Sequence, residues 1–196
     1  MSVMERIESL YLHRGRQMCE DIDGESLSLV EHVLQTAQLA ERDDAGKAMI
    51  TAAFLHDIGQ LLPLPPGADR VDDVHELRAV SFLAEAFASD VLEPIRLHVQ
   101  AKRYLAGRDP SYIARLSPAS ARGLATHGGP MTAFEARLFE ELPCAAEAVQ
   151  LRLYDDRAKV PGQCTPPLDH YLGLLEGYAL RRSRGGRAEI APLSVA

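Results

Sequence analysis

The spacing of apolar residues is helical along most of the chain. Between residues 28 and 42, for example, Val30, Val33, Leu34 and Ala37 recur at intervals of three and four, which places them on one face of a helix. The same periodicity predicts helices over residues 28–42, 45–57, 73–87, 93–105, 117–127, 132–141, 145–158 and 169–181. No segment alternates convincingly with a period of two. The expected fold is therefore all-α, a compact bundle of eight or nine helices.

Start signals sharpen several of these helices. Ser28 is followed three residues later by Glu31, the pattern of a capping box. Asp44 is expected to cap the helix over residues 45–57, because its short acidic side chain can accept hydrogen bonds from free backbone N–H groups. Pro94 is expected in the first turn of the helix over residues 93–105, where proline is tolerated.

The chain shows no internal repeat and no composition shift that would mark a domain boundary. Residues 60–71 carry three prolines and are expected to form a loop, since proline removes a donor and clashes inside a helix. We expect one domain over residues 1–182, followed by a poorly ordered tail over residues 183–196.

Composition narrows the class of protein. The 196 residues are 46% hydrophobic and 25% charged, which is ordinary for a globular domain and excludes a disordered chain. The net charge of −7 and the lack of a long basic run argue against a nucleic-acid partner. No apolar run approaches ~18 residues, so no membrane span is expected. The default expectation is a soluble cytoplasmic protein.

Six residues stand out as candidate metal ligands, and they come from five predicted helices, one of which carries an adjacent pair. They are His32, His56, Asp57, His75, His98 and Asp155. Imidazole and carboxylate groups together suit a first-row divalent metal. Neighbours on a helix point roughly 100° apart, so His56 and Asp57 can hold one ion only at a helix end, or if the carboxylate bridges to a second ion. Gly59 is expected to supply that end, and bundle cores often hold dinuclear sites.

The order of these ligands, His…His-Asp…His…His…Asp, resembles the HD superfamily and its dinuclear branch, which includes myo-inositol oxygenase and phosphonate-cleaving diiron oxygenases. Several sequence segments are similar to 2-amino-1-hydroxyethylphosphonate oxygenase and its trimethylammonio relative. They are residues 98–105, 111–112, 116–120, 128–131, 138–141 and 151–155. This resemblance covers roughly residues 20–180 and is more specific than the ligand order alone.

The resemblance implies a mixed-valent Fe(II)/Fe(III) pair that uses dioxygen. His32, His56 and Asp155 would hold one iron, His75 and His98 would hold the other, and Asp57 would bridge them. The implied reaction breaks the C–P bond of a small 1-hydroxy-2-(substituted amino)alkylphosphonate. Its products would be phosphate and a carboxylate such as glycine or a betaine.

The resemblance also implies a set of substrate contacts. Lys102, Ser120 and Arg152 match positions that contact the phosphonate, and cations with a hydroxyl donor are what a dianion needs. Lys102 lies four residues after His98 and so shares its helix face, which makes it a candidate catalytic residue beside the bridging Asp57. Glu25 matches a carboxylate that faces the cationic nitrogen of the substrate.

The chain departs from this family at two positions. A tyrosine that can occupy an iron position is replaced by Ile22, which cannot ligate a metal, and the nearest preceding tyrosine is Tyr11, expected to pack in the first helix. A histidine that touches the phosphonate is replaced by Gln60, which can donate a hydrogen bond but no charge. Both changes concern substrate entry and recognition, while the six metal ligands are complete.

Other interpretations remain open at this point. A metal-dependent phosphohydrolase acting on a phosphomonoester or nucleotide would use the same ligands to activate water. A regulatory metal-binding module is a third class, although it predicts an incomplete ligand set. Asp156 is an alternative to Asp155 as the last ligand. The remaining histidines, His13, His127 and His170, are expected on the surface or behind the ligands.

Overall fold

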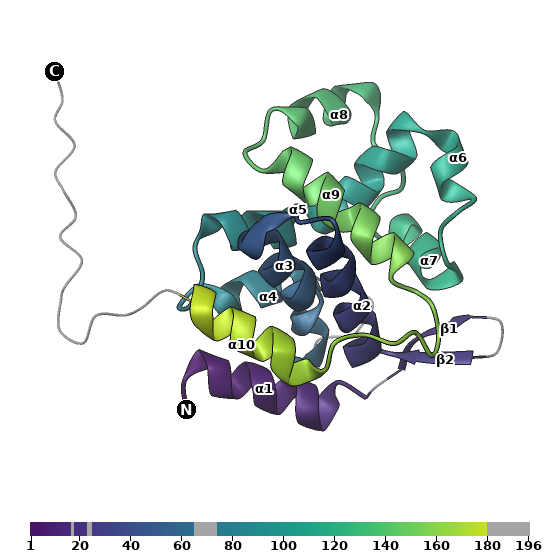
Figure 1. Cartoon of the computed structure of the whole chain (residues 1–196). Helices are drawn as coiled ribbons and strands as arrows, with labels where there is room; N and C mark the ends of the chain where they lie inside the picture. The colour runs from purple at the N-terminus through teal and green to yellow at the C-terminus, as the bar shows by residue number, and fades with distance from the viewer. Residues whose placement is uncertain (17, 23–24, 65–73, 180–196) are drawn as a thin grey trace, which may run out of the picture.

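The computed structural model describes residues 1–16, 18–22, 25–64 and 74–179, and only the backbone of residues 18–22, 25 and 26. This part of the chain forms ten α-helices, one short 3-10 helix and a two-stranded hairpin (Figure 1). The elements are α1 (Val3–Arg14), β1 (Met18–Ile22), β2 (Glu25–Ser28), α2 (Leu29–Arg42), α3 (Gly46–Leu55), η1 (Ile58–Leu61), α4 (His75–Leu83), α5 (Ser89–Arg108), α6 (Pro110–Ile113), α7 (Pro118–Thr126), α8 (Ala133–Glu140), α9 (Ala145–Arg157) and α10 (Leu168–Tyr178). The predicted all-α class is confirmed.

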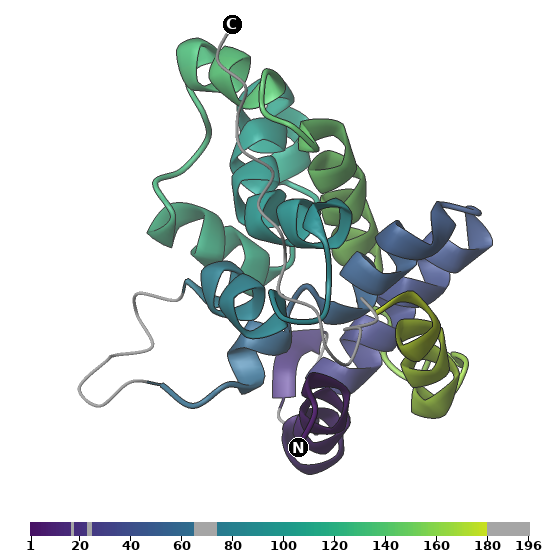
Figure 2. The same cartoon turned by 90° about the vertical axis from the view of Figure 1, so that its left-hand side faces the viewer.

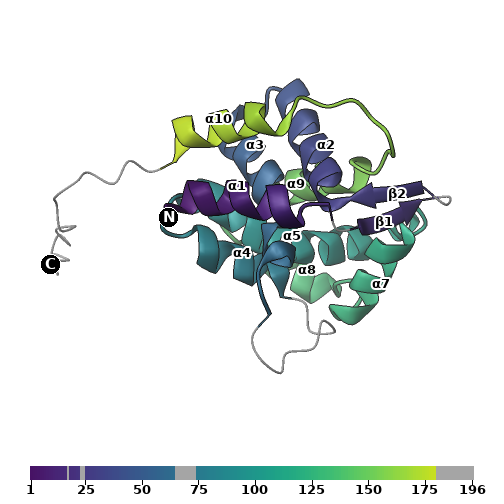
Figure 3. The same cartoon turned by 90° about the horizontal axis from the view of Figure 1, so that it is seen from below.

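The helices pack around four central members. Helix α5 packs against α9, α3 and α4, while α2 packs against α3 and α9. Helix α1 and helix α8 lie at opposite ends of the molecule, as both Figure 1 and the side view in Figure 2 show. Seen from below, α1 runs beside α10 (Figure 3). The central helices α2, α3, α5 and α9 are therefore covered at both ends.

Two apolar clusters make up most of the core. One includes Phe54 of α3, Ile95 of α5 and Leu151 of α9, and the other includes Leu97 of α5 and Ala148 of α9. All five side chains are buried. Because α5 and α9 contribute to both clusters, burial of apolar surface holds these two helices in a fixed relation. That relation matters because α5 and α9 carry ligand-type residues.

Local start signals were correct for some helices and wrong for others. The capping box of α2 forms as predicted, with the Ser28 N–H donating to Glu31 at 2.9 Å. Asp44 does not cap α3: its φ is +49°, and α3 begins after Ala45 without a side-chain cap. The tight α2–α3 turn needs left-handed backbone there, which aspartate tolerates. Helix α5 begins at Ser89, so Pro94 lies inside the helix rather than in its first turn.

The hairpin was not predicted. Strands β1 and β2 pair antiparallel, and Ile22 pairs with Glu25 at the turn end. Residues 183–196 lie outside the described residues, and the domain limits 1–182 stay a prediction. Among the helices that the structure describes, none has the length and apolar character needed to cross a membrane.

Candidate metal centre

The junction between α3 and η1 brings His56 and Asp57 to one place. Helix α3 ends at Leu55, and His56 follows as its C-cap. The backbone of Asp57 is no longer helical, with φ −101° and ψ 4°. This change of backbone direction lets His56 Nε2 lie 3.5 Å from Asp57 Oδ2. The structure thus places the adjacent pair at a helix end, as the argument from helix geometry required.

Gly59 has a different role from the expected helix stop. A Cβ atom at this position would lie 1.9 Å from the carbonyl oxygen of His75, a distance that no side chain can tolerate. The absence of a side chain therefore lets η1 press against the start of α4. Because of this contact, His75 lies next to Asp57, and His75 Nε2 is 3.1 Å from Asp57 Oδ1.

The two oxygens of Asp57 face two different pairs of histidines. On one side, Oδ2 lies 3.8 Å from His32 Nε2 and 3.5 Å from His56 Nε2. On the other side, Oδ1 lies 3.1 Å from His75 Nε2 and 3.9 Å from His98 Nε2. The ligand atoms form two compact groups that share Asp57. A carboxylate with one oxygen toward each group is arranged to bridge two ions.

Asp155 lies beside the first of these groups. Its Oδ1 is 3.4 Å from His32 Nε2, and its Oδ2 is 3.9 Å from His56 Nε2. Asp156, the alternative, instead pairs with Arg152 and accepts a hydrogen bond from the Tyr112 hydroxyl. The geometry therefore favours Asp155 as the sixth ligand.

Three histidines are held in the orientation that a metal ligand needs. Each places Nδ1 against a backbone carbonyl: His32 on Ala158 at 2.8 Å, His56 on Ala53 at 2.8 Å and His98 on Ile95 at 2.7 Å. An imidazole that donates from Nδ1 presents the lone pair of Nε2. The ligand tautomer is therefore set by the backbone.

The Nε2 atoms of three of these histidines have an environment that a cation would stabilise. His56 Nε2 is buried and has no hydrogen-bond partner among the described residues. His75 Nε2 and His98 Nε2 face each other at 3.2 Å. Two imidazole lone pairs at this distance repel unless a cation or proton lies between them. The residues present therefore fit a pair of metal ions.

The charge states of these groups agree with metal binding. Burial lowers the pKa of His56 and, together with the charge of His75, holds the pKa of His98 well below its usual range. Burial acts to raise the pKa of Asp57, but His56 and His75 outweigh it and hold this pKa well below the usual value. Burial acts to lower the pKa of His32, but its hydrogen bond to Asp155 and the charge of that carboxylate outweigh burial and raise this pKa. The pKa shifts of His56, His98 and Asp57 thus favour neutral imidazoles and an ionised carboxylate, the forms that bind metal.

A buried cluster of two cationic side chains and one hydroxyl adjoins the ligands. Lys102, Ser120 and Arg152 are all buried, and they come from α5, α7 and α9. Arg152 Nη2 donates to Ser120 Oγ at 3.2 Å. Burial, followed by the charge of Arg152, lowers the pKa of Lys102 to about 8. The structure therefore brings together the three residues that were predicted to contact a phosphonate.

Two local features support this cluster of side chains. A Cβ atom at Gly123 would lie 2.9 Å from Lys102 Nζ, so glycine leaves space for the ammonium group. Ser120 is the third residue of α7, and its N–H donates to the capping Ser117. Helix α7 therefore begins beside the hydroxyl that Arg152 contacts, and the positive end of a helix dipole favours a nearby anion.

One further cation of this cluster, Lys159, was not predicted from the sequence. The Nζ of Lys159 donates to Ser120 Oγ at 2.8 Å and lies 3.5 Å from Asp155 Oδ1. Lys159 follows Asp155 by four residues, the same spacing by which Lys102 follows His98. Helix α9 ends at Arg157, so the rule that residues four apart share a helix face applies to Lys102 but not to Lys159.

Other predicted site residues lie close by or cannot be placed. Gln60 is partly buried on η1, and its N–H donates to the Asp57 carbonyl at 2.9 Å. Ile22 and Glu25 lie on the hairpin, where side chains are not described. Tyr11 is buried in α1 and donates to the Phe54 carbonyl at 2.6 Å, so it packs in the first helix as expected.

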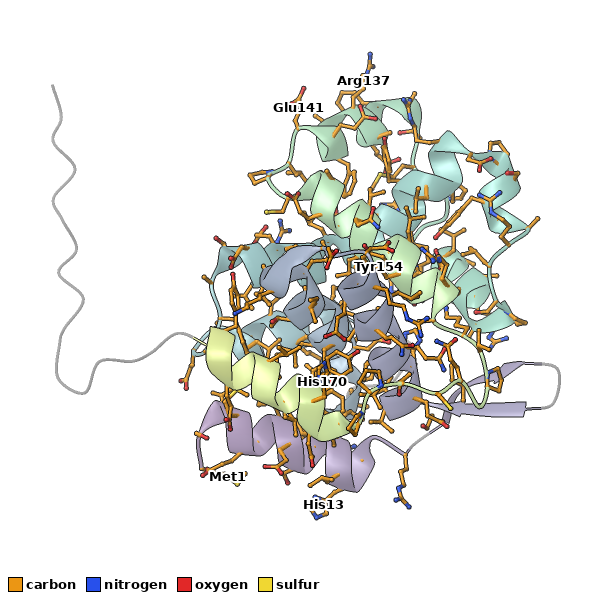
Figure 4. The ribbon with its side chains drawn as sticks, viewed as in Figure 1. Met1, His13, Arg137, Glu141, Tyr154 and His170 are labelled. Atoms are coloured by element: carbon orange, nitrogen blue, oxygen red, sulfur yellow. The ribbon has the colours of Figure 1, made fainter. Side chains whose placement is uncertain are left out.

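The remaining histidines belong to neither group of ligand atoms. His13 points outward from the end of α1 (Figure 4). His170 on α10 is exposed and lies 2.9 Å from Glu41 Oε1, and His127 is partly exposed at the end of α7.

Comparison with known proteins identifies the family. No family model matches the chain. The chain is 42% identical over 176 residues to hydroxymethylphosphonate dioxygenase of Gimesia maris, covering 85% of each chain. It is 33% identical over 178 residues to [1-hydroxy-2-(trimethylamino)ethyl]phosphonate dioxygenase (glycine-betaine-forming) of Leisingera caerulea, covering 89% of each. An uncharacterized protein of Acanthamoeba polyphaga mimivirus is 37% identical over 163 residues, or 81% of this chain and 74% of that one. With two such relatives matched over most of their length, the chain belongs to the family of phosphonate dioxygenases.

Proposed function

We propose that this protein is a dioxygenase that cleaves the C–P bond of a small 1-hydroxyalkylphosphonate. The observation that carries the proposal is the position of Asp57 between two pairs of histidines, beside a buried cluster of cationic side chains. In the overall reaction the C–P bond and one C–H bond at C1 break. Dioxygen is reduced, C1 is oxidised to a carboxylate, and phosphate is released.

The metal ions are proposed to be two irons. His32, His56 and Asp155 would hold one, His75 and His98 the other, and Asp57 would bridge them. When bound, the iron pair supplies the one-electron and oxygen chemistry that amino-acid side chains lack. The HD superfamily assignment rests on the same order of ligands.

The residues of the chain would bind, orient and shield the substrate. Lys102, Arg152 and the Ser120 hydroxyl would hold the phosphonate by charge-assisted hydrogen bonds, so that its hydroxyl-bearing carbon faces the metal ligands. Lys102 would also neutralise charge on the phosphoryl group as it departs. Because all three side chains are buried, water is largely excluded, and each electrostatic contact is stronger than in solvent.

The substituent on C1 is the finer part of the proposal. Glu25 would face a cationic nitrogen, as in a 1-hydroxy-2-(substituted amino)alkylphosphonate. The names of the relatives cover substrates with and without an amine: a trimethylamino compound in one and hydroxymethylphosphonate in the other. We infer the amine-bearing class, with hydroxymethylphosphonate as the alternative for the C1 substituent.

The function is tested by following oxygen uptake and phosphate release with both phosphonates and with p-nitrophenyl phosphate. We expect one phosphate per dioxygen consumed, and no release without oxygen. A metal-dependent phosphohydrolase would instead release phosphate from the aryl ester under anaerobic conditions, and that result would overturn the proposal. A Glu25→Gln variant reports the C1 substituent, since it should impair turnover of the amine-bearing substrate alone.

We expect two irons per chain in protein expressed with an iron supply, because the ligand atoms form two groups that share one carboxylate. Elemental analysis gives the stoichiometry, and electron paramagnetic resonance shows whether the irons are coupled and mixed-valent. A well-folded preparation with one metal or none would contradict the dinuclear assignment.

We expect Lys102→Ala to weaken phosphate binding about 10- to 100-fold without loss of metal, because one charge-assisted hydrogen bond to the anion is removed. Lys102 has a pKa of about 8, so its protonated fraction falls as the pH rises through that value. Phosphate affinity should therefore decline above pH 8 in the wild type and stay level in Lys102→Arg, whose side chain remains charged. Calorimetric titration across pH 7 to 10 measures both effects. An unchanged affinity in Lys102→Ala would place Lys102 outside the anion site.

A further inference from the structure

Among the described residues, Lys159 makes the shortest hydrogen bond to the Ser120 hydroxyl, and its own side chain is almost fully buried. Its side chain is 10% exposed, and its Nζ lies 2.8 Å from Ser120 Oγ and 3.5 Å from Asp155 Oδ1. Holding a lysine chain in one buried geometry costs rotamer entropy. The Lys159 ammonium group thus contacts both Ser120, a proposed phosphonate contact, and Asp155, a proposed metal ligand.

The Ser120 hydroxyl accepts from two cations at once. Lys159 Nζ and Arg152 Nη2 donate to it at 2.8 and 3.2 Å. A hydroxyl has two lone pairs and one proton, so both lone pairs are used and only the proton remains to be donated. Within the part of the chain that the structure describes, no acceptor for this proton is found. The two cations thus make Ser120 a hydrogen-bond donor, which is the role a phosphonate oxygen requires.

The backbone on both sides of Lys159 is fastened to helix α2. The carbonyl of Ala158 accepts from His32 Nδ1 at 2.8 Å. The side-chain amide of Gln35 forms two hydrogen bonds with the main chain of Val160, at 2.8 and 3.0 Å. One turn of α2 therefore carries His32, a proposed metal ligand, and also Gln35, which fixes the main chain next to Lys159.

We propose that Lys159 is a positioning residue for phosphonate recognition, which acts by orienting the Ser120 hydroxyl toward the anion. Lys159 would not itself bind the phosphonate; it works through Ser120, while Arg152 donates to the same oxygen. The inference rests on the proposed function for the identity of the anion, and on the contacts above for the role of the residue.

The test is a double-mutant cycle with inorganic phosphate as the probe, measured by calorimetry on the full, metal-loaded chain. We expect Lys159→Met and Ser120→Ala each to weaken phosphate binding about tenfold, the scale of one hydrogen bond to a charged group. The double variant should be no weaker than either single variant, because both remove the same oriented donor. Lys159→Arg should recover most of the affinity. Lys47→Met, at an exposed position of α3, is the matched control and should leave it unchanged.

Three outcomes would overturn this proposal. Wild-type affinity in Lys159→Met would show that the residue has no part in recognition. Effects of Lys159→Met and Ser120→Ala that multiply in the double variant would show that Lys159 contacts the anion independently. Loss of metal from Lys159→Met would show that it acts through Asp155 instead. If Lys159→Met does not fold, Lys159→Ala, which also removes the donor to Ser120, takes its place in the cycle with Ser120→Ala.

The result is separable from that of the proposed function. Phosphate binding requires no dioxygen and no phosphonate turnover. A cycle that closes as expected in a protein that consumes no 1-hydroxyalkylphosphonate would uphold the positioning role and reject the proposed reaction. A protein that turns over the phosphonate but shows independent effects in the cycle would do the reverse.

Discussion

Replacing Asp57 with alanine is expected to remove metal from both halves of the centre and to abolish turnover. The reason is that its two oxygens face different pairs of histidines, Oδ2 toward His32 and His56, and Oδ1 toward His75 and His98. Losing a bridge removes one ligand from each ion and also the negative charge that offsets two nearby cations. Metal content by elemental analysis, together with oxygen uptake, measures both consequences.

A second ligand variant separates a bridge from an ordinary ligand. His75→Ala should lower the metal content by one ion and spare the ion beside His32, because His75 belongs to one group alone. Asp169→Ala, at an exposed position of α10, controls for the loss of a carboxylate and should keep both ions. Full metal content in Asp57→Ala would disprove the bridging role, whatever the activity.

Replacing Arg152 with methionine is expected to cost about 3–5 kcal/mol of unfolding free energy, the range for breaking a buried ion pair. Arg152 Nη1 lies 2.7 Å from Asp155 Oδ2, and its Nη2 pairs with Asp156. Burial acts to raise the pKa of Asp155, and the charges of Arg152 and then Lys159 hold it well below the usual range. Without Arg152 two carboxylates remain in the interior with less compensation. Denaturant unfolding gives the loss directly.

This variant also changes the pH dependence of stability. A carboxyl group with a lowered folded-state pKa stabilises the fold above its unfolded pKa and loses that contribution as the pH falls through the folded value. In Arg152→Met the pKa of Asp155 should rise toward its unfolded value, so this carboxyl group contributes less stability at neutral pH and less of the loss in acid. The difference in unfolding free energy between the wild type and the variant should therefore shrink as the pH falls. Arg157→Met, on the exposed side of the same helix, should change stability by less than about 0.5 kcal/mol. Equal losses in the two variants would show that Arg152 contributes only as a surface residue does.

The parts of the fold that sequence could predict are those in which the signal is local. The capping box of Ser28 and Glu31 lies within four residues, so it correctly located the start of α2. Asp44 failed because the turn between α2 and α3 sets its backbone in left-handed geometry, a constraint that comes from packing two helices. The hairpin over β1 and β2 failed because a two-stranded ribbon is stable only with the support of neighbouring structure.

The candidate site divides in the same way. Ligand types and their order could be read directly, and the resemblance suggested how they would be grouped. The division of the Asp57 oxygens between the two sides required three-dimensional structure, since it depends on the close contact that Gly59 allows between η1 and α4. Lys159 lies beyond the end of α9, where the helical pattern had stopped. Its position depends on hydrogen bonds from α2, which no local spacing reveals.

The hydrogen bond between His32 and Ala158 joins residues 126 positions apart, and this separation bears on how the protein is made. Asp57, His75 and His98 all lie within the first half of the chain, so their group can be assembled while a ribosome is still translating the second half. The other group needs α9 for Asp155 and the segment after it for the orientation of His32. At about 5–20 residues per second, these arrive several seconds later. The two groups of ligand residues therefore become complete at different times during synthesis, and the group containing His32 is complete only after translation has passed Ala158.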